Sequence, residues 1–556
     1  MTAWLTPMVS DAEARRRALE PGSSFIVQAP AGSGKTTLLV QRLLALLATA
    51  EQPEEVVAIT FTRKAAAEMR QRVIGALQQA ALGNPPAAAH EAETFRLATA
   101  AIKRDRAKGW NLLQSSGRLK VDTIDALNLW LAERLPLLSG AIAGLELVDD
   151  ARSLFRQAAR LCLGQLPDSG ATGASLRRLL DTFDNKADQL ERLLITLLPR
   201  RDRWLHHLTP GEGDLELRTR LEAGLQALVE RELETARQVL QQQGAQGWLV
   251  FLNHAGEHAT KGALTQWTEH AQLPEPRGDC LAEWRSLTEL FLTKTGAWRK
   301  QVDKSIGFPT TEPSIKADFK DLLAELASNT VVLATLNNIR GLPEPRYDDS
   351  EWQALLDFRQ VAIATATELQ LVFRQRGQCD FVELALLAQR ALGDLENPSD
   401  LLLALDHRIR HLLIDEFQDT SYGQFELLKK LTAGWDGSDG RTLFLVGDPM
   451  QSIYRFRDAD MSLFLKVRDA GLGSLLPESL VLRQNFRSQA GLINWVNSAM
   501  APLMPPQDDL ARGAAAFVPS DAVRGANEGP QLRWLDTADP IAEVKEAVGI
   551  LATELA

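Results

Sequence analysis

The eight residues "APAGSGKT", Ala29 to Thr36, constrain the fold more than any other stretch of the sequence. They follow an apolar run, residues 25–27, and precede a helical pattern of leucines that starts at Leu38. A glycine-rich turn between a strand and a helix is the arrangement of a phosphate-binding loop, or P-loop. The alternative, a glycine-rich turn without a ligand, explains the flanking strand and helix less well.

The residue types of this turn suit phosphate groups. Gly32 and Gly34 let backbone amides turn inward around oxygen anions, and the helix N-terminus adds partial positive charge. Lys35 reaches the outer phosphates, and the Thr36 hydroxyl binds Mg²⁺. We therefore expect a nucleotide site formed by Ala29, Pro30, Ala31, Gly32, Ser33, Gly34, Lys35, Thr36 and Thr37.

A second apolar strand, in "LLIDE", ends in two carboxylates. Ligands bind at the carboxyl ends of strands in open parallel sheets, so we expect Asp415 to hold the Mg²⁺ shell there. Glu416 would orient and deprotonate the attacking water. A surface Asp-Glu pair is the alternative. Ser421 and Gln424 fit a capping box, which predicts that the next helix starts at that point.

Two further segments carry polar and aromatic candidates. In "LVGDPMQSIYRF", Gln451 is placed to sense the γ-phosphate, and Tyr454 and Phe456 offer aromatic rings. In "LRQNFRS", Arg487 would bring a cation from a second lobe to stabilise charge on the transferring phosphoryl group. Such an arginine also couples hydrolysis to domain closure.

The chain of 556 residues is too long for one core. Strand and helix patterns alternate at first, with a small helical insertion at about 78–118, and the same α/β organisation returns near Asp415. About 290 residues separate Asp125 from Asp415, so the intervening helical stretch predicts an inserted domain. We expect α/β domain parts at 1–150 and 376–479, an inserted helical domain at 151–375, and the start of a second α/β domain at 480–556.

Composition excludes several classes of protein. The apolar fraction of 45% and the charged fraction of 24% are those of an ordinary globular protein, with no signal-peptide pattern and no long apolar segment. We therefore expect a cytoplasmic protein with no membrane contact. Three scattered cysteines fit a reducing compartment and no metal-ligand spacing. The net charge of −11 disfavours nucleic acid only weakly, because a local basic track is sufficient for binding.

Six segments in order, "APAGSGKT", "AITFTRKAAAEMRQR", "VDTIDAL", "LLIDEFQDTS", "LFLVGDPMQSIYRFR" and "LRQNFRS", resemble the motifs of the UvrD/Rep/RecB family of superfamily-one DNA helicases. The match covers the α/β portions, and the long inserted domain is similar to the RecB and AddA branch. The resemblance implies a RecA-like P-loop NTPase sheet and an incomplete second RecA-like lobe. The later family motifs, and a nuclease cluster, do not occur before Ala556.

The resemblance also implies roles for residues at matching positions. The positions that match ATP and Mg²⁺ contacts are Lys35, Thr36, Asp415, Glu416, Gln451 and Arg487, with Phe486 where the family stacks a ring on adenine. The positions that match contacts to single-stranded DNA are Phe61, Thr62, Arg63, Thr123, Asp125, Tyr454 and Phe456. Stacking tolerates any base sequence because every base has a π-face.

The chain departs from the family pattern at four positions. Arg15 stands where relatives often carry a glutamine that reads adenine, and Thr37 where they often place an arginine against the base. Asp125 replaces a histidine, and an anion is a poor contact for a phosphate backbone. Phe456 replaces tryptophan, a change that stacking should survive.

Two features of the helical region have ordinary explanations. His254 and His258 lie four residues apart on an expected helix with Glu257 between them, but the sequence offers no third ligand, so we predict no metal site. Helix packing is the expected use of the six tryptophans of this region, which are Trp204, Trp248, Trp267, Trp284, Trp298 and Trp352.

The sequence thus predicts an ATP-dependent single-strand DNA translocase, the motor of a DNA repair or recombination helicase. Its expected partners are single-stranded DNA, junctions between single- and double-stranded DNA, and a helicase-nuclease partner subunit. Because the second lobe is incomplete, we expect weak or no unwinding by residues 1–556 alone. Two alternatives remain open: a nucleotide-dependent module that binds DNA or a partner without turnover, and a P-loop ATPase that acts on a protein.

Overall fold

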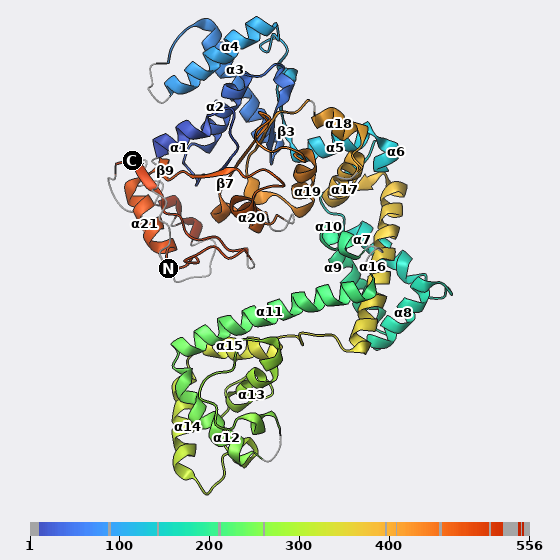
Figure 1. Ribbon diagram of the computed structural model, residues 1–556, viewed down its shortest axis with the longest axis vertical. Coiled ribbons are helices and arrows are strands. Elements are labelled where there is room, and N and C mark those ends of the chain that lie inside the picture. The colour runs from blue at the N-terminus through green and yellow to red at the C-terminus, as the bar shows by residue number, and fades with distance from the viewer. Residues whose placement is uncertain are drawn as a thin grey trace. The chain divides into compact units, whose positions relative to one another are not determined.

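The computed structural model describes residues 11–86, 91–141, 144–208, 213–259, 262–394, 397–406, 408–454, 459–510, 513–525, 543–545 and 547–549 (Figure 1). The chain divides into two compact units, one of residues 1–158, 195–206 and 368–556, the other of residues 159–194 and 207–367. Phe456 and the strand expected at residues 531–540 lie outside the described residues. Of the helix expected after that strand, residues 543–545 and 547–549 are described and are helical.

A six-stranded parallel sheet forms the centre of the first unit, with the strand order β3-β2-β6-β7-β1-β8. The α/β class and the parallel sheet predicted from the sequence are confirmed. A two-stranded pair, β9 and β10, and another, β4 and β5, lie outside this sheet. The strands are β1 (Phe25–Gln28), β2 (Val56–Thr60), β3 (Lys120–Thr123), β4 (Glu146–Leu147), β5 (Gln378–Cys379), β6 (His411–Ile414), β7 (Thr442–Gly447), β8 (Glu478–Val481), β9 (Gln484–Gln489) and β10 (Asp521–Arg524).

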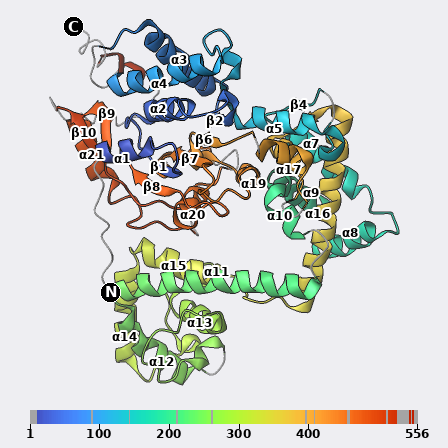
Figure 2. The same ribbon diagram turned by 45° about the horizontal axis from the view of Figure 1, so that its top comes forward.

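Both faces of the sheet are buried, which explains why its central strands read as continuous apolar runs. In β7, Phe444 and Val446 belong to the core on one face, whereas Leu443 and Leu445 belong to the core on the other. Figure 2 shows α2 (Lys35–Leu47), α3 (Arg63–Leu82) and α4 (Ala92–Lys108) on one side of the sheet, and α19 (Tyr422–Leu431) and α20 (Ser462–Ala470) on the opposite side.

The other helices complete the two units. They are α1 (Asp11–Ala18), α5 (Ile124–Arg134), α6 (Pro136–Ser139), α7 (Arg152–Leu163), α8 (Ala171–Thr182), α9 (Ala187–Leu197), α10 (Arg201–Leu208), α11 (Asp214–Gln242), α12 (Leu249–His258), α13 (Leu281–Phe291), α14 (Pro313–Leu326), α15 (Thr330–Gly341), α16 (Asp349–Arg376), α17 (Phe381–Leu392), α18 (Asp400–Asp406) and α21 (Ala490–Met500). Among the helices described, none is both long and apolar enough to cross a membrane.

The second unit has its own apolar core, built from α11 to α15. Trp248, Trp267 and Trp284 are buried in this core. The Trp267 and Trp284 indole groups each donate a hydrogen bond, to Ser286 Oγ at 2.7 Å and to the Glu275 carbonyl at 3.0 Å. The predicted packing role is therefore confirmed for these three tryptophans.

A buried arginine joins α10 to the start of α17. Arg201 is 1% exposed, and its guanidinium donates to both Asp380 carboxylate oxygens, at 2.7 and 2.5 Å, and to Glu383 at 3.2 Å. Burial alone would lower the pKa of Arg201, but the two carboxylates more than offset burial and raise it. The bidentate geometry is one that lysine could not supply.

Substituting Arg201→Met should therefore destabilise the first unit by about 3 kcal/mol or more, because it leaves two buried carboxylates without a cation. Urea unfolding followed by circular dichroism measures the change. Arg192→Met is the matched control: its ion pair with Asp188 joins side chains that are 67% and 66% exposed, so a change below about 0.5 kcal/mol is expected. Equal effects of the two substitutions would contradict the importance of the buried pair.

Candidate nucleotide site

Four segments far apart in the sequence meet at one edge of the sheet. The strands β1, β2, β6 and β7 run parallel, so the residues after them share the carboxyl edge. These residues are the P-loop after β1, Phe61 after β2, Asp415 after β6 and Asp448 after β7. The edge therefore carries every candidate motif that follows these four strands.

The P-loop turn has the conformation that its glycines allow. Gly32 and Gly34 have φ angles of 82° and 79°, in the left-handed region that side chains disfavour. A Cβ at Gly32 would also lie 2.7 Å from Asn485 Oδ1. Helix α2 begins at Lys35 without a side-chain cap, and the buried Ser33 hydroxyl has no hydrogen-bond partner within the described residues. Unpaired donors around a tight turn suit an anionic ligand.

The Lys35 side chain lies between the two carboxylates that follow β6. Its Nζ contacts Glu416 Oε2 and lies 3.8 Å from Asp415 Oδ1. Burial raises the pKa of Asp415 to about 6, although Lys35 acts against that shift. Two carboxylates that already hold one cation in a desolvated site form a donor set suited to Mg²⁺.

A glutamine that sequence analysis did not assign joins the carboxylates to the next strand. Gln418 is 1% exposed; its Nε2 donates to Glu416 Oε2 at 2.9 Å and to Asp419 Oδ2 at 3.2 Å, and its Oε1 accepts from the Asp448 amide at 2.9 Å. Gln451 Nε2 donates to Asp448 Oδ2. Burial raises the pKa of Asp419 to about 6 and also raises that of Asp448. The signal available in the sequence was the position of Gln418 directly after the carboxylate pair.

The backbone at Glu416 is unusual. Its φ angle of 52° lies in the left-handed region, which a residue with a Cβ occupies only when the surroundings hold it there. The predicted capping box is confirmed just downstream, where Ser421 caps α19 and Gln424 returns a bond to the Ser421 amide. The turn between β6 and α19 is thus fixed at both ends.

Strand β9 brings three residues to the P-loop. The buried Asn485 donates through Nδ2 to the Ala31 carbonyl at 2.8 Å, and the Phe486 amide donates to the Gly32 carbonyl at 2.8 Å. Asn485 Oδ1 also accepts from the Arg487 amide at 2.9 Å, and the Arg487 side chain is exposed. Arg487 therefore lies beside the turn, next to a positioning residue that sequence analysis did not identify.

Arg15, the departure from the family pattern, contacts the same turn. Its Nη2 donates to the Ser33 carbonyl at 2.5 Å, and its guanidinium lies 5.2 Å from the centre of the Phe486 ring. Burial lowers the pKa of Arg15, while Asp11 acts in the opposite direction. Arg15 therefore positions the P-loop and the ring that was predicted to stack on adenine.

The residues predicted to bind DNA divide into two groups. The Phe61 and Tyr454 rings pack against each other with centroids 4.5 Å apart and an angle of 38°. Thr62 and Thr123 cap helices, because their hydroxyls accept from the amides three residues later at 3.1 and 3.2 Å. Arg63 is exposed at the start of α3.

Asp125 lies in a strongly acidic hollow. Phe61 borders this hollow, whose ionisable lining residues are Asp125, Asp149, Asp150, Arg152, Asp202, Asp380 and Asp419. Such a lining repels phosphate groups and disfavours a backbone contact at Asp125.

The parallel sheet, the glycine turn and the lysine held between two carboxylates define a P-loop nucleoside triphosphatase with a RecA-like fold. The family described as "UvrD/REP helicase N-terminal domain" matches residues 10–470 of this sequence. The chain belongs to this UvrD/REP helicase family, and the resemblance described from its motifs is confirmed.

Individual relatives are all named as the same component of an "ATP-dependent helicase/nuclease". The protein of Lysinibacillus sphaericus is 26% identical over 87% of this chain and 39% of its own length. That of Lactiplantibacillus plantarum is 28% identical over 90% and 40%, and that of Moorella thermoacetica 28% identical over 97% and 37%. The chain thus spans about two fifths of the length of these curated relatives.

Substituting Asp415→Asn should stabilise the nucleotide-free chain at pH 8. Its pKa is raised from 3.8 to about 6, so the ionised carboxylate costs the folded state free energy that grows as the pH rises from about 4 to 6. Two pKa units correspond to roughly 3 kcal/mol, and we expect a gain of about 2 kcal/mol because Lys35 loses one partner.

Chemical unfolding at pH 8 and pH 5 measures this gain, which should be smaller at pH 5. Asp188→Asn, at an exposed position, is the control and should change stability by less than about 0.5 kcal/mol at either pH. A loss of stability at pH 8 in the Asp415 variant would contradict the account.

Proposed function

We propose that residues 1–556 form the ATP-driven motor portion of a single-strand DNA translocase, within a DNA repair or recombination helicase. The observation that carries this proposal is the position of Lys35, held against Glu416 and Asp415 beside the P-loop. The Phe61–Tyr454 ring pair follows strands of the same sheet edge. Membership of the helicase family supports the same conclusion.

The residues at the sheet edge fit ATP and Mg²⁺. The open amides after Gly32 and the unpartnered Ser33 hydroxyl suit phosphate oxygens, while Thr36 and Asp415 would hold the metal ion. When bound, Mg²⁺ neutralises charge on the phosphates. Lys35 would exchange its carboxylate contacts for the outer phosphates. Glu416, released from Lys35, would orient the attacking water and accept its proton at the carboxylate.

A hydrogen-bonded route links this carboxylate to the aromatic pair. Gln418 bonds both Glu416 and Asp419, and Ser452 Oγ donates to Asp419 Oδ1 at 3.2 Å. Ser452 is two residues before Tyr454. A change of partner at Glu416 would therefore reach the segment that holds the Tyr454 ring, which supports coupling between hydrolysis and the grip on bases.

The wider assignments rest on the names of the relatives and on the sequence. We propose junctions of single- and double-stranded DNA as the substrate, a helicase-nuclease partner subunit, and a cytoplasmic location. The domain boundaries near residues 150, 375 and 479 are proposed on the same basis.

ATP hydrolysis by residues 1–556, measured with and without single-stranded DNA, tests the proposed function. A motor predicts a rate that rises with DNA and falls with added salt. A clamp without turnover predicts DNA binding with no stimulation, and an ATPase acting on a protein predicts no affinity for single strands. Either of the last two results would overturn the proposal.

Substituting Glu416→Gln should lower the rate of phosphate release by about 10² to 10⁴, the usual contribution of a general base, while nucleotide affinity is retained. The amide keeps an oxygen that can accept from Gln418, so the fold should be preserved. Glu426→Gln on α19, whose carboxylate pairs with Lys429 on the same helix, is the control and should hydrolyse ATP normally. An active Glu416 variant would remove the proposed base.

Substituting Tyr454→Ala should weaken binding of single-stranded DNA about tenfold, because one stacked base contributes about 1–3 kcal/mol. Fluorescence anisotropy with a labelled oligonucleotide measures the affinity. Tyr454→Phe keeps the ring and should bind as the unmodified chain does. Equal affinity for the alanine variant would show that bases do not stack at this pair.

A further inference from the structure

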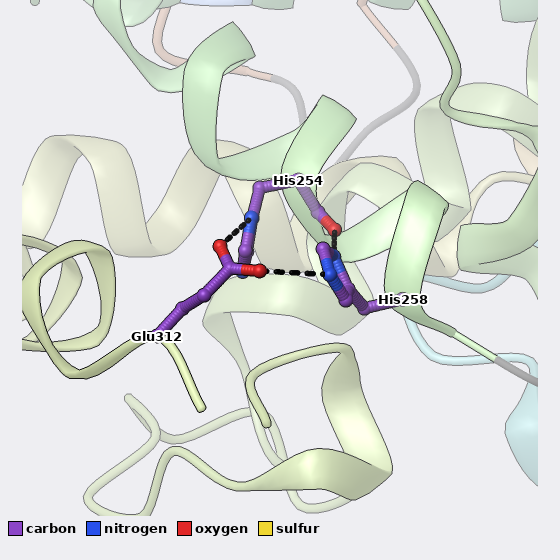
Figure 3. A group of neighbouring side chains, drawn as sticks. All are labelled: His254, His258 and Glu312. Carbon is purple, nitrogen blue, oxygen red and sulfur yellow. Dashed lines mark hydrogen bonds and ion pairs between the residues drawn. The ribbon is translucent and has the colours of Figure 1, made fainter. Parts of the chain in front are cut away.

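Three potential metal ligands meet in the second unit, apart from the residues of the nucleotide site. His254 and His258 lie on α12, and Glu312 immediately precedes α14 (Figure 3). Their ligand atoms all lie within 4.8 Å of one another. The sequence offered no third ligand beside the histidine pair, and the fold supplies it from a distant segment.

The spacing of these atoms suits a small tetrahedral ion. His258 Nε2 lies 3.1 Å from Glu312 Oε1, and His254 Nδ1 lies 3.5 Å from Glu312 Oε2. Ligands at about 2.0–2.1 Å from Zn²⁺ in tetrahedral geometry are about 3.3 Å apart. Two histidines separated by four residues on one helix face are also a known way to hold zinc.

The hydrogen bond of His258 fixes which nitrogen faces the carboxylate. Its Nδ1 lies 3.0 Å from the His254 carbonyl, which can only accept, so Nδ1 carries the proton (Figure 3). In the neutral imidazole, Nε2 then points a lone pair at Glu312. Two lone pairs at 3.1 Å repel unless a proton or a metal ion lies between them. The position therefore requires a cation.

The surroundings of His254 favour a metal ion over a proton. His254 is 7% exposed, and its Nε2 has no hydrogen-bond partner in the part of the chain that is described. Burial lowers the pKa of His254, with His258 acting in the same direction and Glu312 against it, so this imidazole resists protonation. A neutral imidazole is the form that binds metal.

The backbone that carries the histidines is closely packed on both sides. A Cβ at Gly256 would lie 1.7 Å from the Trp267 carbonyl oxygen, and one at Gly307 would lie 2.3 Å from the Ala255 carbonyl oxygen. The Phe308 ring packs on His254 with centroids 5.2 Å apart. These contacts limit movement of the ligands, which is what a preorganised site needs.

We propose that His254, His258 and Glu312 bind one divalent transition-metal ion, with Zn²⁺ the best match, and that the ion ties α12 to the start of α14. Two imidazoles and one carboxylate form a nitrogen and oxygen donor set that zinc accepts. Three protein ligands leave the fourth position for water. The site is proposed as structural, and it does not depend on the function proposed above.

Zinc titration of the chain of residues 1–556, freed of any affinity tag and stripped with chelator, tests the proposal. Competition with a chromophoric chelator should show one tight site per chain. Glu312→Gln and His258→Ala should each weaken it by at least about tenfold, the scale on which even outer-shell changes act. Glu257→Gln and His270→Ala, which alter a nearby carboxylate and another histidine of the same unit, should leave it unchanged.

Two further measurements keep the result independent of misfolding. Circular dichroism should show that the conservative Glu312→Gln variant is folded, and Co²⁺ in place of Zn²⁺ should give the intense visible absorption of a four-coordinate ion in the unmodified chain only. Absence of a tight site, or a site that survives both ligand substitutions, would overturn the proposal. The cluster would then be a histidine–glutamate ion pair only.

Discussion

The contact of Lys35 with the carboxylates after β6 is the interaction on which the rest of the account depends. It joins the helix that starts at the glycine turn to a strand whose sequence position is nearly 400 residues later. The contact also carries a cost, because burial raises the pKa of Asp415 and Glu416 has a left-handed backbone. Charge and strain held in this way are typical of sites whose ligand restores the balance.

The hydrogen bonds around Gln418 extend this contact across the sheet edge. One amide side chain reaches the residues after β6 and the amide that follows β7, so a change at Glu416 cannot remain local. Asn485 performs a comparable task on the other side of the P-loop, where it joins the turn to the backbone of Arg487. Buried amides suit such positions because they both donate and accept.

The sequence was sufficient for the α/β fold and for the elements next to the motifs. The P-loop, the start of α3 at Arg63 and the capping box at Ser421 depend on residues within a few positions of each other, and local chemistry decides them. The pairing of Phe61 with Tyr454 required the strand order, which no local pattern contains.

Other contacts were beyond sequence reasoning for the same physical reason. The bond from Arg15 to the P-loop and the approach of Glu312 to the two histidines join segments whose separation along the chain gives no periodic signal. Thr62 and Thr123 illustrate the opposite limit, since a hydroxyl at a helix start serves as a cap whether or not DNA is present.

A crystal structure of the chain with Mg²⁺ and a non-hydrolysable ATP analogue tests the central claim most directly. The account predicts the phosphates in the Gly32–Gly34 turn, Lys35 Nζ moved from Glu416 to a phosphate oxygen, and the metal ion beside Thr36 and Asp415. A nucleotide bound elsewhere, or Lys35 still paired with Glu416 beside a bound nucleotide, would contradict it.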